Sequence, residues 1–184
     1  MTIVHEIKES IRSIIPFDKQ EEQHLQFTEE WLDSGTGIFR LVKPATPDPH
    51  LVAYFLLLDP TQKKVLLVDH KKAGLWLPSG GHVELNEHPR ETVQREVMEE
   101  LSIQADFLLQ NPFFLTITKT VGYAPGHTDI SVWYLLRGCT HDVYSFDEEE
   151  FHGIKWFTPS DIPYEHSDPH MQRCIEKLKK LDLL

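Results

Sequence analysis

Apolar residues near the start of the chain recur three or four positions apart, which is the spacing of one face of an α-helix. This stripe runs through residues 2–15, and Pro16 then ends the helix because it cannot continue the hydrogen-bond pattern. The apolar positions are Ile3, Ile7, Ile11, Ile14 and Ile15. The pattern therefore predicts an amphipathic helix over residues 2–15.

A second helix is expected directly afterwards, over residues 18–34. Asp18 suits its N-cap, and Glu21 follows three residues later, as in a capping box. Gly35 suits the position just past the helix end, where the backbone is often left-handed. Residues 1–40 are therefore predicted to form an N-terminal helical extension.

After a proline-rich segment the period of the pattern changes. Residues 51–58 and 65–70 are continuous apolar runs separated by the turn-forming sequence DPTQKK, so they predict a hairpin of two buried strands. The other elements expected are a short strand up to residue 84, a helix over 88–101, strands over 108–121, 129–137 and 154–157, a loop over 122–127 and a closing helix over 172–181. Strands around a central helix predict an α/β layered domain with a mixed sheet.

The composition is that of an ordinary soluble protein. A chain of 184 residues suits one domain with a proper core and a small appendage, and its 40% hydrophobic and 26% charged residues are typical of globular proteins. No apolar run approaches the roughly 18 residues of a membrane helix, and the N-terminal sequence lacks the apolar centre of a signal peptide. We therefore expect a cytoplasmic protein with no membrane partner.

The formal net charge of −11 narrows the choice of partners. Proteins that bind long nucleic acids neutralise phosphates with Lys and Arg, so this acidic chain is not expected to bind them. A nucleotide remains compatible, because metal ions can hold its few phosphates. Cys139 and Cys174 lie far apart without CxxC spacing, and we expect both to be reduced structural thiols.

The helix predicted over residues 88–101 places three glutamates within five positions. Glu96, Glu99 and Glu100 occupy positions i, i+3 and i+4, which share one helix face, and each like-charged pair costs about a few tenths of a kcal/mol. One interpretation is a solvated face with ion pairs such as Arg95 to Glu99. The other is a site for a hard cation, since clustered carboxylates suit Mg²⁺ or Mn²⁺ bridging a phosphate.

The sequence around these glutamates resembles the signature of the Nudix hydrolases, G-x5-E-x7-R-E-U-x-E-E-x-G-U, where U is a bulky aliphatic residue. Over residues 81–103 every defined position matches except one, since Ser102 stands where the family has its second glycine. The preceding sequence GLWLPSGGHVE resembles the segment that usually precedes this box in the family, which has a tryptophan shortly before a double glycine. A non-glycine residue in a left-handed conformation costs roughly 1 kcal/mol, so the departure affects the local turn and leaves the charged positions intact.

The resemblance implies a fold and a reaction. The fold is the Nudix fold, an α/β/α sandwich with a mixed β-sheet, expected over residues 41–184 behind the helical extension of residues 1–40. The reaction expected of such a MutT-like enzyme is divalent-metal-dependent hydrolysis of a nucleoside di- or triphosphate by water attack on phosphorus. The products would be a nucleoside monophosphate and phosphate, pyrophosphate or another phosphorylated group.

The resemblance also assigns roles to residues of the box. The implied ligands of Mg²⁺ or Mn²⁺ are three carboxylates and one backbone carbonyl, namely those of Glu96, Glu99, Glu100 and Gly80. Arg95 and Glu87 would form a supporting pair that orients the ligands, with a surface salt bridge as the alternative. Family members often take a general base from a box glutamate or from a later acidic loop. Glu150, in the sequence DEEE, is the first choice on such a loop and Glu149 the next; an acidic surface loop is the alternative.

Several residues near the box are candidates for substrate binding. Gly80 and Gly81 would let the backbone approach phosphates or make a turn that other residues could not. His82 could contact a phosphate or simply pack. His127 and Asp129 could hydrogen-bond a base or sugar, or cap a loop.

Aromatic side chains and histidines complete the candidates. Nucleobases could stack on one of four aromatic residues that otherwise belong to the core, Trp76, Phe113, Phe114 and Tyr123. The histidines near the box lie on different segments without the paired spacing of a zinc motif, so the sequence does not predict a zinc site; they are His70, His82, His88 and His127.

Alternative functions differ in what they require of the chain. A nucleotide-sugar or dinucleoside polyphosphate hydrolase would use the same box. A catalytically inactive Nudix-fold nucleotide sensor usually lacks a box glutamate, and none is missing here. An isoprenoid diphosphate isomerase would need a cysteine motif that the sequence around Cys139 does not resemble. The N-terminal helices suit either a cover over the pocket or the interface of a homodimer.

Overall fold

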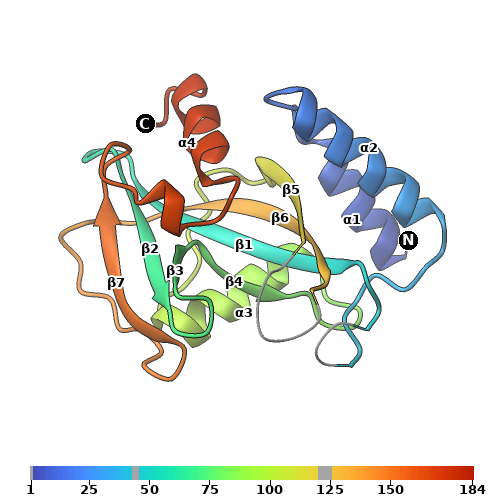
Figure 1. Ribbon diagram of the computed structural model, residues 1–184, viewed down its shortest axis with the longest axis horizontal. Helices are drawn as coiled ribbons and strands as arrows, with labels where there is room; N and C mark the ends of the chain where they lie inside the picture. Colours follow the sequence, from blue (N-terminus) through green and yellow to red (C-terminus); the bar gives the residue numbers. More distant parts are fainter. Residues whose placement is uncertain (1, 43–45, 120–125) are drawn as a thin grey trace. The chain divides into compact units, whose positions relative to one another are not determined.

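The computed structural model describes residues 2–42, 46–119 and 126–184. The chain divides into two compact units, which are described one at a time. The first unit comprises Met1–Tyr54, Gly80–Val93 and Leu109–Tyr134, and the second unit comprises Phe55–Ser79, Gln94–Leu108 and Leu135–Leu184. Figure 1 follows the chain through its helices and strands. Three strands and one helix contribute residues to both units: β1 (His50–Asp59), β4 (Ser79–His82), β6 (Thr128–Arg137) and α3 (Pro89–Leu101).

Two N-terminal helices belong to the first unit, α1 (Ile3–Arg12) and α2 (Lys19–Asp33), and they pack side by side (Figure 1). The predicted capping of α2 is confirmed, because the Asp18 carboxylate accepts a hydrogen bond from the Glu21 backbone N–H at 2.8 Å. The expected helix over 2–15 ends early, at Arg12, and Ile15 is 82% exposed rather than part of the buried stripe. The cause is Pro16, which disfavours the helical conformation of the residue before it.

A buried carboxylate connects α2 to the sheet of the first unit. Glu21 accepts from the Phe17 N–H at 2.6 Å with one oxygen and from the Leu115 N–H at 3.2 Å with the other. Leu115 lies on β5 (Phe114–Lys119), on which α2 packs. The capping residue that the sequence predicted therefore also holds the helix against the strand.

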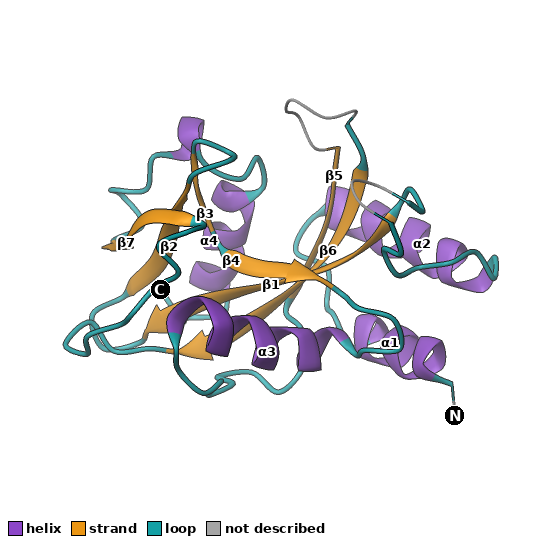
Figure 2. Cartoon of the chain, turned by 90° about the horizontal axis from the view of Figure 1, so that it is seen from below, coloured by secondary structure: helices purple, strands orange, loops and turns teal. Residues whose placement is uncertain are grey.

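The strand on which α2 packs, β5, is paired with a second strand of the first unit. β5 runs antiparallel to β6, from Phe114 opposite Trp133 to Lys119 opposite Thr128 (Figure 2). The expected strand over 108–121 was wrong at its start, because it begins only at Phe114. Pro112 precedes it and has no N–H to donate to a ladder. The core of this unit contains buried side chains of helix and strand, including Ile7, Ile11, Phe114, Val132 and Trp133.

The second unit contains the predicted hairpin. β2 (Lys64–His70) runs antiparallel to the second half of β1, with Leu57 opposite Leu66. The remaining elements of this unit are β3 (Leu75–Leu77) and β7 (Phe151–Phe157), which both pair with β2, a 3-10 turn η1 (Tyr164–His166) and α4 (Met171–Lys180). The last strand therefore begins three residues before the expected position 154. The core of the second unit includes Leu57, Leu66, Phe157, Cys174 and Leu178.

Hydrogen bonds connect the strands in the order β3-β2-β1-β6-β5, with β4 (Ser79–His82) paired to β1 and β7 to β2. The expected α/β fold with a mixed sheet and N-terminal helices is confirmed. In the part of the chain that is described, no helix is long and apolar enough to cross a bilayer. Both cysteines are free thiols, as expected. The division between residues 1–40 and 41–184 stays a prediction.

The turn between β1 and β2 is organised by the buried carboxylate of Asp59. One oxygen accepts bonds from the Thr61 N–H at 2.9 Å, the Thr61 hydroxyl at 2.6 Å and the Gln62 N–H at 3.0 Å. The other accepts from the Thr140 N–H at 2.8 Å and hydroxyl at 2.9 Å. Burial by itself would raise the pKa of Asp59, but these hydrogen bonds hold it well below its ordinary value.

The end of α3 is shaped by Ser102. Its φ of 55° is in the left-handed region, and its N–H donates to the Met98 carbonyl at 3.1 Å. The left-handed conformation expected at this departure from the Nudix signature is therefore present, and an exposed serine takes the place of the glycine that would adopt it without strain.

We expect Asp59→Asn to lower the free energy of unfolding by about 2 kcal/mol near neutral pH, because the amide nitrogen cannot accept the bonds that one carboxylate oxygen accepts. Since the folded-state pKa is depressed, this stabilisation is fully present above the unfolded-state pKa of about 4 and is lost progressively as the pH falls below that value toward the folded-state pKa. Urea unfolding across the acidic range measures both effects. The exposed Asp142→Asn is the control, and a gap from wild type that does not narrow in acid would contradict the assignment.

We expect Ser102→Gly to raise the free energy of unfolding by about 0.5 kcal/mol, since relief of the left-handed strain exceeds the added entropy of the unfolded chain. Ser102→Val should lower it by about 1 kcal/mol, because a β-branched residue fits a positive φ poorly. Denaturant unfolding gives the order. Ser145→Gly, at an exposed position whose φ is negative, should not stabilise the protein. Equal stability of the Gly and Val variants at position 102 would exclude the strain.

Candidate active site

The short strand β4 approaches β1 so closely that only glycine fits at its second position. Gly80 has a φ of 141°, and a Cβ there would lie 2.2 Å from the Ala53 carbonyl oxygen and 2.9 Å from the Tyr54 Cα. Such contacts do not occur in real proteins, so Gly80 is required for strand pairing. The structural reason for this glycine is close strand approach rather than a turn, and it is compatible with the expected approach to phosphates and with the role as a metal ligand, which both stay predictions.

Helix α3 begins with its N-terminal groups satisfied locally. The Glu91 carboxylate accepts from the His88 N–H at 2.9 Å, as a capping residue does. Glu87 accepts from the Glu84 N–H at 3.0 Å and from the Thr92 hydroxyl at 2.7 Å. These two contacts fix the carboxylate of Glu87 at the start of the helix. Its expected pair with Arg95 joins residues of different units and stays a prediction.

The three box glutamates lie in the second unit and have different surroundings. Glu100 is only 6% exposed and accepts a hydrogen bond from the buried hydroxyl of Ser79 at 2.5 Å. Glu96 is half-buried, and its Oε1 lies 2.6 Å from Nη1 of Arg95. The side chain of Glu99 is 59% exposed, with Oε2 at 3.5 Å from the same nitrogen. On the helix face that the spacing predicted, one carboxylate is therefore buried, one is half-buried and one is exposed.

The pKa of Glu96 depends on its burial and on the charged groups around it. Burial raises its pKa, the hydrogen bond and charge of Arg95 lower it, and the charges of Glu99 and Glu150 raise it again, so that it stands above its ordinary value. Two other carboxylates are therefore close enough to oppose its negative charge. A cation at this position would remove that repulsion.

The acidic loop before β7 is attached to the end of α3. The Asp147 N–H donates to the Glu100 carbonyl at 2.9 Å, and the Glu150 carbonyl accepts from the Lys71 N–H at 2.9 Å. The effect of Glu150 on the pKa of Glu96 places its carboxylate near the box. The loop chosen from the sequence therefore lies beside the box glutamates within the second unit.

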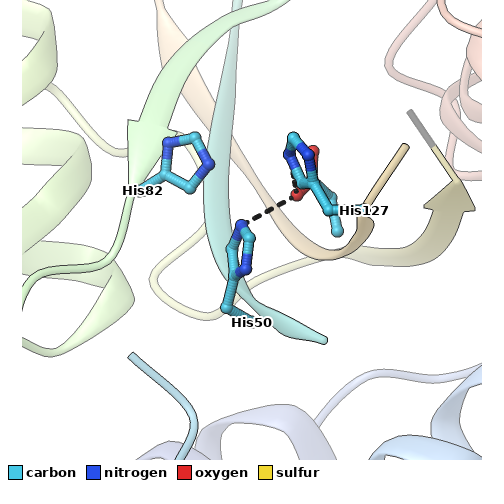
Figure 3. A group of neighbouring side chains, drawn as sticks. His50, His82 and His127 are labelled. Atoms are coloured by element: carbon cyan, nitrogen blue, oxygen red, sulfur yellow. Dashed lines mark ion pairs between the residues drawn. The ribbon is translucent and has the colours of Figure 1, made fainter. Parts of the chain in front are cut away.

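The substrate-binding candidates His82, His127 and Asp129 converge in the first unit, together with a fourth residue, His50 (Figure 3). Asp129 Oδ1 lies 3.1 Å from Nε2 of His50 and 3.3 Å from Nε2 of His127. Sequence reasoning missed His50. The sequence HTD does indicate that His127 and Asp129 lie together, because residues i and i+2 of a strand share a face. No sequence pattern indicates that His50 lies beside them.

His50 is fully buried at the start of β1. Its Nδ1 lies 2.8 Å from the Pro47 carbonyl oxygen, so this nitrogen carries a proton and donates. Burial lowers the pKa of His50, but the hydrogen bonds with Asp129 and Pro47 and the charge of Asp129 outweigh it and raise the pKa overall. Nδ1 is committed to a carbonyl, and Nε2 faces the carboxylate.

The other candidates have separate surroundings. Trp76 is half-buried in the second unit, with its ring edge-on to Phe157 at 5.1 Å between centroids. Phe113 and Phe114 are buried core residues and not stacking surfaces, and Tyr123 lies outside the described residues. His70 contacts the ring of Phe151 within the second unit.

Comparison with known proteins supports one family. The family model described as NUDIX domain matches residues 48–178. Curated protein sequences gave no match. A solved NUDIX-family hydrolase from Clostridium perfringens is similar, with 25% identity, a TM-score of 0.56 and coverage of 72% of this chain and 97% of that chain.

Two further solved structures share the fold. A MutT NUDIX hydrolase from Burkholderia pseudomallei has 23% identity and a TM-score of 0.53, covering 70% of this chain and 96% of that chain. The E. coli dihydroneopterin triphosphate pyrophosphohydrolase has 18% identity and a TM-score of 0.53, covering 69% and 92%. The family model spans most of the chain and includes the box at residues 81–103. The chain therefore belongs to the Nudix hydrolase family and is a pyrophosphohydrolase, from a family that acts on nucleotide-linked diphosphates and generally uses divalent metal ions.

Proposed function

We propose that the protein hydrolyses a nucleoside di- or triphosphate to the nucleoside monophosphate in a reaction that depends on Mg²⁺ or Mn²⁺. The observation that carries this proposal is the carboxylate face of α3, where Glu96, Glu99 and Glu100 are all present and the pKa of Glu96 is raised by burial and by neighbouring carboxylates. A hydrolase that acts on an anionic phosphate chain needs cations at its site, and this face supplies the oxygen ligands they prefer.

The residues present fit a hard divalent ion. Glu100 is oriented by the Ser79 hydroxyl, and a ligand held by a neighbouring hydrogen bond loses little freedom on binding. Glu96 and Glu99 share the guanidinium of Arg95, which keeps both carboxylates on one side of the helix. Bound ions would neutralise the phosphates and activate a water for in-line attack on phosphorus.

Proton transfer is assigned to the acidic loop. Glu150 stands near Glu96, and its backbone is fixed by the bond to Lys71, so its carboxylate suits a general base or a later-loop ligand. Glu149 is the second choice, because it is exposed on the same turn. Glu87 and Arg95 are positioning residues in this proposal, since they orient the helix and its ligands.

Substrate contacts are proposed for residues near the two glycines. The backbone at Gly80 and Gly81 is proposed to approach the phosphates closely, and Trp76 offers a half-buried aromatic face for a base. His82, His127 and Asp129 are proposed to contact the base or sugar. Nucleotide sugars and dinucleoside polyphosphates are the alternative substrates, and a nucleotide sensor without turnover is the alternative function. A cytoplasmic location and a homodimer built on the N-terminal helices stay predictions.

We expect Glu99→Gln to lower kcat by at least about 100-fold for every nucleotide turned over, because it removes a ligand of the catalytic metal. Released phosphate or pyrophosphate is measured across a nucleotide panel with Mg²⁺. Thermal unfolding should hardly change, since the side chain is exposed. Glu22→Gln, at an exposed position of α2, is the matched control. Activity within a few-fold of wild type would remove Glu99 from the mechanism, and binding of nucleotides by the wild type without turnover would favour the sensor.

We expect Glu150→Gln to lower kcat by at least about tenfold with little change in KM, because a lost base affects the chemical step. The exposed neighbour Glu148→Gln should stay within about twofold of wild type. Steady-state kinetics on the best substrate of the panel decide between them. A larger loss for Glu149→Gln than for Glu150→Gln would move the role to Glu149.

A further inference from the structure

Three histidines and one aspartate of the first unit, none of them a box glutamate, lie close enough together to hold a metal ion. One possible ligand atom from each of His50, His82, His127 and Asp129 lies within 4.8 Å of all the others. Figure 3 shows the three imidazoles gathered around the carboxylate, which is joined to His50 and His127 by ion pairs. We propose that these four residues of the first unit bind one Zn²⁺ ion, in addition to the metal of the Nudix box.

The distances suit one small ion. With zinc–nitrogen and zinc–oxygen bonds of about 2.0–2.2 Å, neighbouring ligand atoms of a tetrahedral site lie about 3.3–3.5 Å apart. The Asp129 oxygen is 3.1 Å from His50 Nε2 and 3.3 Å from His127 Nε2. The other ligand atoms lie within 4.8 Å of one another, so binding one ion would require side-chain rotations that shorten the longest separations by about 1 Å.

The protonation of His50 prepares it to be a ligand. Because Nδ1 donates to the Pro47 carbonyl, the neutral ring has its lone pair on Nε2, which points at Asp129. A bond from the second ring nitrogen to a carbonyl is the usual support of a metal-binding histidine. His50 Nε2 and Asp129 Oδ1 are both buried and face each other at 3.1 Å, and while Nδ1 holds the only proton of the neutral ring, neither of the two atoms carries a proton to donate. Two buried acceptors at this distance need a cation or a proton between them.

Arg40 limits how His82 can bind. Its Nη1 lies 3.0 Å from His82 Nε2, and since a guanidinium only donates, that nitrogen is an acceptor. In that tautomer Nδ1 carries the proton, so His82 binds the ion through Nε2 once the guanidinium has moved aside, or through Nδ1 once the proton has moved to Nε2 and the bond to Arg40 is broken. Three neutral imidazoles, one carboxylate and Zn²⁺ give a net charge of about +1. This charge would lie beside the guanidinium of Arg40, and four protein ligands would hold the ion against the repulsion.

The ligand types select zinc over the metal of the box. Imidazole nitrogens suit Zn²⁺, whereas Mg²⁺ prefers oxygen ligands. Four protein ligands leave no open position for a substrate, which is typical of a structural site. The ligands come from β1, β4 and the start of β6, so the ion would fasten together three strands. His82 follows Gly80 by two residues, so the ion would also hold the strand that carries the box glycines.

The competing explanation is an ion pair in which a protonated His50 binds Asp129 without metal. The substrate-binding role proposed above for His82, His127 and Asp129 is a second competitor. Each explanation gives a different result when bound zinc, unfolding temperature and KM are measured on the same set of proteins.

The experiment uses the full chain, stripped of metal, loaded with ZnCl₂ and desalted. We expect about one zinc per chain by atomic emission, retained in excess Mg²⁺, and an unfolding temperature at least about 5 °C above that of the stripped protein, since a ligand that binds only the folded state stabilises it. Loading with Co²⁺ should give the visible bands of a tetrahedral site.

Variants locate the ion. His127→Gln and the isosteric Asp129→Asn should each lower zinc affinity by at least about tenfold and abolish the zinc-dependent shift in unfolding temperature. The exposed His152→Gln of the second unit and the box variant Glu99→Gln should both keep the zinc of wild type. Circular dichroism checks the fold of each variant.

Two results would overturn the proposal. A stripped and reloaded wild type that binds less than about a fifth of an equivalent of zinc leaves the ion pair as the explanation, and this result needs no variant. Zinc retained in full by His127→Gln and Asp129→Asn places the ion elsewhere. A raised KM for His127→Gln without loss of zinc favours the substrate-binding role, and neither zinc result decides whether the box hydrolyses nucleotides.

Discussion

Mutual repulsion among carboxylates on one face of α3 is the constraint on which the active site depends. A helix by itself would gain nothing from Glu96, Glu99 and Glu100 at such close spacing. The surrounding structure holds them in place: Ser79 binds the buried Glu100, and Arg95 binds the other two. Burial and neighbouring charge keep the pKa of Glu96 above its ordinary value. In the proposed function, cations and an anionic substrate would offset this repulsion.

The backbone around this helix is fixed by contacts that few residues could make. Gly80 lets β4 lie against β1 at a distance that any side chain would prevent. After the helix, Ser102 turns the chain with a positive φ, and the Asp147 N–H binds the last turn of the helix at the Glu100 carbonyl. The geometry of the box therefore depends on backbone approach and hydrogen bonding as much as on the glutamates.

Two kinds of ligand are gathered in this chain, and their chemistry differs. The box presents oxygens, whereas the group around His50 presents three imidazoles and one carboxylate. Hard ions that keep their waters suit the first, and a transition-metal ion suits the second. If both proposals hold, this difference in ligand type would direct different ions to the two sites.

Patterns within a short stretch of sequence determined much of this protein. The helical stripe of α1, the cap of α2 by Asp18, the β1–β2 hairpin and the box on α3 all follow from spacing over a few residues. The left-handed turn at Ser102 followed from a single departure from a family signature. Such features are local, because period and capping depend on neighbours along the chain.

Tertiary structure alone decided what required distant strands to meet. The bond from Glu21 to Leu115 and the environment of each box carboxylate could not be obtained from spacing. The meeting of His50 with His82 and His127 is the clearest example, since their strands pair across long stretches of sequence. Pairing partners are selected by packing over the whole sheet, and no local pattern records them.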